Sequence, residues 1–236
     1  MKVLRINFAL GMVLVSGLAS AAPVQLLSNG GFETGNLTGW VTSGLGTTGT
    51  CPSQGRDWNV SSLPSATGCS EAGSPVSGVY AAYVMNDGGF ANTTYTLSQS
   101  FVVSSGLTAA ALSWSDSSVS NYSGAARLFF VDILKGTTLL ANIYTYSVPL
   151  TDFDAGWNAR SFDISSLLLA NVGNTLTLRF SNSIPSVWTG PAGLGVDEVS
   201  LLANVSTVPE PATLFMLGLG LSGIVFSKRH KRSKAD

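Results

Sequence analysis

The sequence contains a single histidine, His230, which lies in a basic segment at the C-terminus. The residues before this segment therefore cannot form a Ser-His-Asp or Cys-His arrangement or a histidine metal site. Glycoside hydrolysis needs only two facing carboxylates, but Asp197 and Glu198 are adjacent in an expected strand and point to opposite faces. Asp152 and Asp154 are typical turn acids in PLTDFDAGW. The composition favours a non-catalytic protein, with a glycoside hydrolase using paired carboxylates as the remaining enzymatic alternative.

Charge is also scarce, since Asp, Glu, Lys and Arg make up 11% of the chain. Most of the basic residues lie near the two ends, and the long middle region carries few of them. A protein that binds nucleic acid needs a basic patch or stripe to neutralise phosphates. The sequence therefore excludes nucleic acid as a partner.

The N-terminus has the pattern of a secretory signal peptide. Lys2 and Arg5 precede an apolar run over residues 8–18, and small residues in an A-x-A pattern follow at 19–22. We predict a signal peptide over residues 1–22 and export across the inner membrane. The region from 23 to 205 is long enough for one domain with a substantial core.

Cysteine is nearly absent, and the two that occur, Cys51 and Cys69, lie in a stretch rich in glycine, serine and proline. In an exported chain we predict that they form a disulfide bond, which stabilises by roughly 3 kcal/mol on the loop-entropy model. A reactive thiol or a metal pair is the alternative, but nothing nearby in the sequence would activate a thiolate.

Long helical patterns are missing, and the middle region consists of short strand-like segments separated by turn residues. Apolar and polar residues alternate in NTLTLRFSN, residues 174–182. Only the segment 165–171 has a brief helical pattern. We predict an all-β fold, an antiparallel β-sandwich or jelly roll, with Trp40 and Trp114 in its core.

Four short motifs are spread along the predicted domain: NGGFETGNLTGW (29–40), SGVYAAYV (77–84), TLSQSFVV (96–103) and VDEVSLL (196–202). Together they resemble the galactose-binding-like jelly roll used by many carbohydrate-binding modules. The resemblance covers most of the predicted domain and implies the fold. We predict a structural or adhesive domain without catalytic activity, and a dedicated carbohydrate-binding module is the alternative.

Asp197 is a candidate calcium ligand. It shares strand parity with Val199 and Leu201, so we expect it to face the core, where an unpaired carboxylate is costly. The resemblance implies a structural Ca²⁺ held by Glu33 and Asp197, with backbone carbonyls near Asn29, Ser77 or Gly78 completing the oxygen shell. The alternative is that Asp197 lies at the mouth of the strand and accepts hydrogen bonds from turn N–H groups.

Three tryptophans, Trp58, Trp157 and Trp188, lie in loop-like surroundings. An exposed ring at any of them could stack on a sugar, and Trp188 is the strongest candidate. The alternative for each is a lid over the edge of the core.

The C-terminal segment combines three elements in order. Val208-Pro209-Glu210-Pro211 precedes an apolar stretch over residues 212–226, which is short for a membrane of about 30 Å but could span it. A basic tail over residues 227–236 follows and would keep the C-terminus in the cytoplasm; it contains Lys228, Arg229, Lys231 and Arg232.

This order of elements, behind a signal peptide, resembles the PEP-CTERM sorting signal over residues 206–236. The resemblance implies processing near the motif by an exosortase and transient anchoring in the inner membrane. It further implies delivery to the cell surface or extracellular matrix, where exopolysaccharide or another glycan would be the partner. A permanent single-span anchor is the alternative.

Overall fold

The structure is a computed structural model, and it describes the chain in eight ranges: residues 22–44, 56–62, 73–86, 92–120, 125–148, 153–154, 156–185 and 192–206. The predicted disulfide cysteines, Trp188, the signal peptide up to residue 21 and the sorting segment from residue 207 lie outside these residues. The part from Ala22 to Ser206 forms one compact unit.

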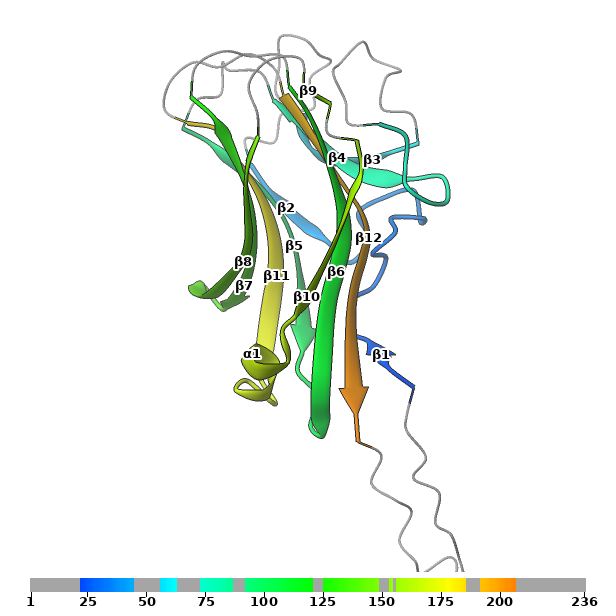
Figure 1. Cartoon of the computed structure of the whole chain (residues 1–236), viewed down its shortest axis with the longest axis vertical. Coiled ribbons are helices and arrows are strands. Elements are labelled where there is room, and N and C mark those ends of the chain that lie inside the picture. Colours follow the sequence, from blue (N-terminus) through cyan, green and yellow to red (C-terminus); the bar gives the residue numbers. More distant parts are fainter. Residues whose placement is uncertain are drawn as a thin grey trace, which may run out of the picture. The chain divides into compact units, whose positions relative to one another are not determined.

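The described residues form two antiparallel sheets that pack face to face as a sandwich (Figure 1). The seven-stranded sheet has the order β10 (Asn158–Asp163), β6 (Leu107–Ser120), β12 (Ala192–Val205), β4 (Ala81–Asn86) and β3 (Arg56–Ser61), with β1 (Val24–Gln25) paired to β12 and β9 (Phe153–Asp154) paired to β6. The five-stranded sheet has the order β2 (Val41–Ser43), β5 (Thr94–Val102), β11 (Thr175–Ser183), β7 (Arg127–Lys135) and β8 (Thr138–Val148). The predicted all-β sandwich is confirmed.

The core lies between the two sheets. In β11 the apolar residues Leu176, Leu178 and Phe180 are fully buried, as their alternation predicts. Trp114 of β6 reaches them from the opposite sheet, with its ring centroid 5.9 Å from that of Phe180. Trp40 is also buried, so the prediction that both tryptophans belong to the core is confirmed.

A polar cluster closes one side of the sandwich, where the edge strands β10 and β8 approach each other. The buried carboxylate of Asp116 accepts hydrogen bonds from Trp114 Nε1 at 2.8 Å and from Arg160 Nε and Nη2 at 3.0 and 3.1 Å. The Arg160 guanidinium lies over the ring of Tyr144 of β8, 4.8 Å from its centroid. Asp116 therefore satisfies a buried indole and links the two sheets through Arg160.

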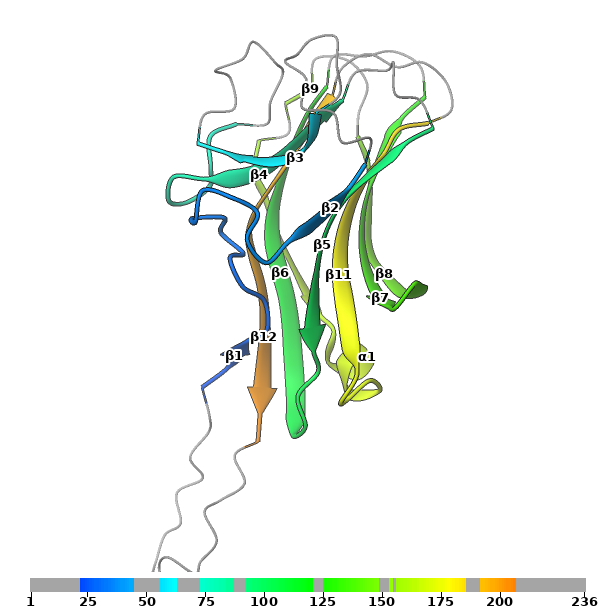
Figure 2. The same cartoon turned by 180° about the vertical axis from the view of Figure 1, so that it is seen from behind.

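The brief helical pattern corresponds to α1 (Ser165–Leu169), which follows β10. The turn from α1 to β11 brings the chain to the end of the sandwich where β12 also finishes (Figure 2). The predicted helical segment is confirmed.

Candidate functional site

The outer face of the five-stranded sheet carries a double row of hydroxyl groups along β5 and β11. The two strands pair in register, so that Thr94 lies opposite Ser183 and Ser100 lies opposite Thr177. Hydroxyl oxygens approach to 3.3 Å in the first pair and to 2.9 Å in the second. We call this row the hydroxyl ladder; its members are Thr94, Thr96, Ser98, Ser100, Thr175, Thr177, Ser181 and Ser183.

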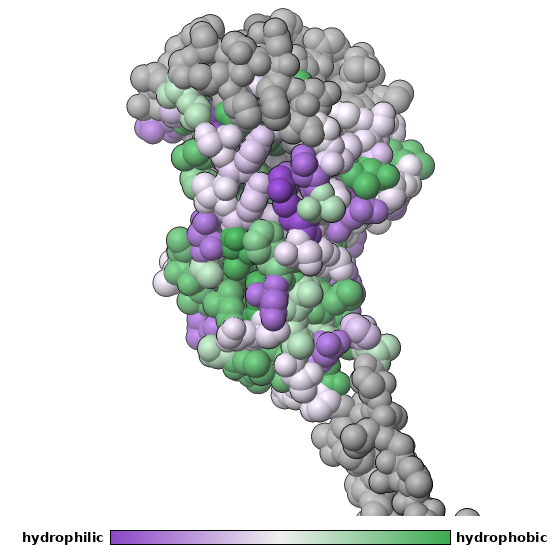
Figure 3. All heavy atoms as spheres, in the orientation of Figure 1, coloured by the Kyte–Doolittle hydropathy of each residue, from purple (hydrophilic) through white to green (hydrophobic). Residues whose placement is uncertain are grey.

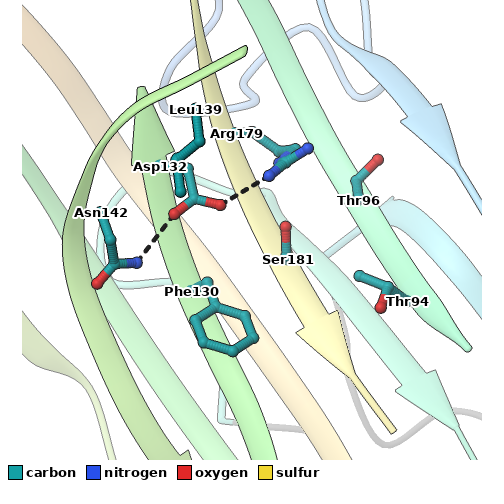
Figure 4. A pocket seen from close by; sticks show the side chains of 8 residues that line it. All are labelled: Thr94, Thr96, Phe130, Asp132, Leu139, Asn142, Arg179 and Ser181. Carbon is teal, nitrogen blue, oxygen red and sulfur yellow. Dashed lines mark hydrogen bonds and ion pairs between the residues drawn. The ribbon is translucent and has the colours of Figure 1, made fainter. Parts of the chain in front are cut away.

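A groove of about 550 Å³ includes one end of the hydroxyl ladder and extends from β5 and β11 over β7 and β8 (Figure 4). The ring of Phe130 and the exposed side chain of Leu139 form its apolar walls. Its lining consists of Thr94, Thr96, Phe130, Asp132, Leu139, Asn142, Arg179 and Ser181. Apolar, hydroxyl and charged side chains therefore meet in one groove, and apolar walls with a few polar groups are typical of ligand sites.

An ion pair lies across the groove floor. Register places Arg179 of β11 opposite Asp132 of β7, and Arg179 Nη2 donates to Asp132 Oδ2 at 2.8 Å. The other carboxylate oxygen accepts from Asn142 Nδ2 at 2.9 Å. Figure 4 shows Asp132 between these two partners. The carboxylate is largely buried, whereas about a third of the Arg179 side chain is exposed.

Arg179 has a second donor that no described residue accepts, because its buried Nε atom has no hydrogen-bond partner in this part of the chain. A buried donor without a partner costs free energy, so an oxygen acceptor that reaches it is favoured. The charges of Arg179 and Asp132 cancel. The groove therefore suits an uncharged ligand with several hydroxyl groups better than an anion or a cation.

This groove is not among the sites predicted from the sequence, although the sequence contains one signal of it. Arg179 lies on the polar side of the alternating NTLTLRFSN segment, which predicts an outward-facing cation. Its pairing with Asp132 depends on the register between β11 and β7. That register forms only when the two distant segments pair in the folded sheet, so neither segment predicts it alone.

The tryptophans predicted to stack on sugars are placed differently. Trp58 is part of strand β3 rather than a loop, and its side chain is 3% exposed within the core. The prediction that it offers an exposed ring is wrong, because the ring packs between the sheets. Trp157 is half-buried; its Nε1 donates to Ser74 O at 2.6 Å and its ring meets Tyr83 edge-on, with centroids 6.3 Å apart. Trp157 thus covers the outer face of the seven-stranded sheet.

Asp197 is buried, as predicted, but its side chain lies on the outer face of β12 and not on the predicted core face. The pairing of β12 with β6 shifts between Asp197 and Ser200, where Glu198 adopts φ 52°. This bulge inserts a residue, so Asp197 no longer shares a face with the core residue Leu201. The parity argument is therefore wrong at this position, and Asp197 points outward, where a neighbouring segment covers it completely.

Glu33 and Asp197 hold that covering segment through its backbone amides. Asp197 Oδ2 accepts from Val76 N at 3.0 Å, and Glu33 Oε1 accepts from the N–H groups of Val79 and Tyr80, each at 3.0 Å. Desolvation by burial raises the pKa of Asp197 to about 6, although the amide hydrogen bonds oppose it. The alternative role for Asp197, as an acceptor of turn N–H bonds, is the one that this geometry fits.

The candidate calcium ligands have hydrogen-bond partners within the protein. The backbone oxygen of Asn29 accepts from Trp40 Nε1 at 3.1 Å, and the Asn29 amide group donates to the carbonyl oxygens of Asn36 and Thr38. Among the described residues, no three His, Cys, Asp or Glu side chains gather in a way that could hold a metal ion. Glu33 and Asp197 are occupied by N–H donors, and the Ca²⁺ assignment stays a prediction.

The C-terminal segment matches a family model, the PEP-CTERM protein-sorting motif, over residues 207–229. The match confirms the resemblance seen at Val208–Pro211, and the motif implies export and sorting to the cell surface. In the parts of the chain that the structure describes, no helix is long and apolar enough to cross a membrane. The predicted span at 212–226 lies outside those parts.

The solved structures to which the chain is similar include carbohydrate-binding modules of the β-sandwich type. The module TmCBM61 in complex with β-1,4-galactotriose is 16% identical, with 77% of this chain and 99% of that chain covered and a TM-score of 0.46. An apo cyclase from Fischerella sp. is 17% identical over 80% of this chain and 100% of its own, with a TM-score of 0.48. A CBM4 structure is 15% identical over 75% and 99% of the two chains, with a TM-score of 0.38. No curated protein matches the chain. At these identities and TM-scores, the similarity carries no activity over to this protein.

Proposed function

We propose that this protein is exported and anchored transiently in the inner membrane through residues 212–226. An exosortase-type enzyme then processes it near Val208–Pro211, and the domain is delivered to the cell surface or extracellular matrix. The sorting-motif match over 207–229 and the signal-peptide pattern of residues 1–22 support this route. The basic tail keeps the C-terminus in the cytoplasm before processing.

Intact-mass analysis of native protein tests the processing. The expected mass lacks the basic tail, from Lys228 to Asp236. Native protein that retains this segment would contradict processing and would favour a permanent anchor.

At its destination the domain acts, in our proposal, as a non-catalytic adhesive module that binds uncharged glycan chains of the matrix. The observation that carries this proposal is the groove with the Asp132–Arg179 pair beside the hydroxyl ladder. The apolar face of a sugar ring can pack on Phe130, while its hydroxyl groups accept from Arg179 and donate to Asp132. Further sugars of the same chain would lie over the hydroxyl ladder.

Catalysis is not part of the proposal because the groove lining contains a single carboxylate, Asp132. Both of its oxygens already accept hydrogen bonds from protein side chains. Glycoside hydrolysis uses a pair of carboxylates at a defined separation. Incubating a bound oligosaccharide with the domain and analysing the products would reveal hydrolysis if this reasoning is wrong.

A glycan array followed by calorimetry on residues 22–206 tests the binding. We expect uncharged glycans to bind, and Phe130→Ala and Arg179→Met each to weaken binding about tenfold or more, which corresponds to roughly 1.4 kcal/mol. Val41→Ala is the matched control, since Val41 is exposed on the same sheet but outside the groove.

Two results would contradict glycan binding in this groove. If no glycan binds, the domain is a structural surface protein defined by its sorting motif. If binding survives both groove substitutions and is lost in Trp188→Ala, a dedicated carbohydrate-binding module with its site at that tryptophan is favoured.

A further inference from the structure

The chain leaves the domain from one end of the sandwich. Hydrogen bonds there join the end of β12, the turn between β5 and β6, and the segment after α1. Ser206, the last described residue, donates its N–H to Gly106 O at 2.9 Å in the turn between β5 and β6. That turn is bonded in the same way to the segment after α1, because Gly173 N donates to Val103 O at 2.9 Å. At the N-terminal side, β1 pairs with β12. Both ends of the domain therefore emerge at this place (Figures 1 and 2).

Exposed aliphatic side chains lie toward this end, on the outer faces of both sheets and in and just after α1. Val102 is 59% exposed, Leu169 is 46% exposed and Val172 is 42% exposed. On the side of the seven-stranded sheet, Val24 and Leu202 are 46% and 41% exposed. We call these five side chains the exit-end surface. Figure 3 shows hydrophobic residues over the lower half of the domain, toward the same end.

A groove of about 420 Å³ continues the exit-end surface. Leu202 and the small side chains of Ala109 and Ala111 line it, with Asp163 and Ser165 among its polar residues. Within the segments 22–25, 102–110, 163–174 and 202–206, Asp163 is the sole charged residue. Its carboxylate is engaged by the N–H of Ser165 at 2.8 Å. The end from which the chain emerges is thus nearly uncharged and partly apolar.

The sequence limits how far this end can move from the segment that follows it. The sorting motif begins at residue 207, directly after Ser206. Between Ser206 and Ala212, where the apolar stretch begins, there are only six Cα–Cα steps, which reach about 20 Å when fully extended. In the unprocessed chain, whatever surface holds residues 212–226 therefore begins within about 20 Å of Ser206, at the end of the domain that carries the exit-end surface.

We infer that the exit-end surface lies on the lipid surface of the membrane while the apolar stretch is inserted there. This inference rests on the proposed transient anchoring. A phospholipid surface fits because the exit-end surface offers aliphatic side chains that can pack against lipid. Since this surface carries almost no charge, neither zwitterionic nor anionic headgroups repel it. The short tether supplies a high effective concentration, so a weak contact is sufficient. The contact holds residues 207–211 close to the membrane, where a membrane enzyme processes them.

Hydrogen–deuterium exchange on residues 23–236, the chain without its predicted signal peptide, in nanodiscs of phosphatidylcholine and phosphatidylglycerol tests the inference, with residues 23–206 in solution as the reference. We expect the amides of residues 102–106 and 165–174 to exchange about tenfold more slowly in the nanodisc. The double substitution Leu169→Ser with Val172→Ser abolishes this protection. The matched control, Val41→Ser with Leu128→Ser, changes exposed aliphatic residues elsewhere and retains it.

The other outcomes overturn the inference in distinguishable ways. A chain that remains in the nanodisc without protection at these segments refutes lipid contact but leaves the anchoring intact. Protection that needs added processing enzyme identifies a protein partner in place of lipid. A chain that does not insert into the nanodisc refutes the transient anchor, and the inference fails with it.

Discussion

Replacing Asp197 by asparagine removes a fully buried carboxyl group that holds the segment around Val76 on the outer face of β12. Burial raises the pKa of this carboxyl from 3.8 to about 6, since the cost of desolvating the charge exceeds the gain from its backbone hydrogen bonds. Asparagine keeps an acceptor oxygen but carries no charge at any pH. The substitution therefore isolates the cost of ionising this site.

The sign of the pH effect follows from proton binding. Between about pH 4 and pH 6 the folded protein holds a proton at Asp197 that the unfolded chain has lost, so the free energy of unfolding falls as the pH rises through this window. A tenfold change in proton affinity is worth about 1.4 kcal/mol, so the contribution of Asp197 falls by about 3 kcal/mol from below pH 4 to pH 7. Asp57, whose pKa burial also raises, is present in both proteins and cancels in the comparison.

Urea unfolding followed by tryptophan fluorescence measures this difference, at about pH 4 and about pH 7.5 in the presence of a chelator. We expect the wild-type protein to lose about 2–3 kcal/mol more than Asp197→Asn over this interval. If the two pH profiles are parallel within about 0.5 kcal/mol, Asp197 is not desolvated in the folded protein and the reasoning fails.

Three further predictions concern calcium and packing. If Asp197 binds Ca²⁺, calcium must raise the melting temperature of the wild-type protein but not that of Asp197→Asn. Because backbone amides already donate to the carboxylate, we expect calcium to shift the wild-type melting temperature by less than about 1 °C in differential scanning calorimetry. Asp116→Ala removes the acceptor of the buried Trp114 indole and one partner of a largely buried ion pair, so we expect urea unfolding to show a loss of about 2–4 kcal/mol; a loss below about 1 kcal/mol would show that the cluster does not hold the sheets together. Gly30→Ala would place a Cβ atom 1.8 Å from the backbone oxygen of Val199, so we expect a loss above about 3 kcal/mol or failure to fold, and a thermal stability equal to wild type would contradict this packing.

Much of the sandwich can be predicted from sequence because alternation directly reports which side chains face the core. In β11 the pattern assigns Leu176, Leu178 and Phe180 to the core, and the structure agrees. The same rule fails in β12 because a single residue with positive φ, Glu198, shifts the parity around Asp197. Nothing in the local sequence marks that bulge, since the residue there is not glycine.

The candidate site is harder to predict for a different reason. Asp132 and Arg179 come from strands whose sequences are far apart, and only the register of β7 against β11 brings them together. The prediction that Trp58 is exposed rested on the loop-like composition around it. In the structure Trp58 lies in a short strand, and its ring is buried in the core. The glycan-binding residues proposed from the structure are thus strand residues with outward side chains.

Mapping of amide chemical shifts by NMR, with residues 22–206 titrated by an uncharged oligosaccharide selected from the array, tests whether the five-stranded sheet binds glycans. We expect the largest shifts on β5, β7, β8 and β11, around Asp132 and Arg179, and we expect them to diminish in Arg179→Met. Shifts confined to the seven-stranded sheet, or equal shifts in the wild-type and substituted proteins, would contradict a glycan site on this face.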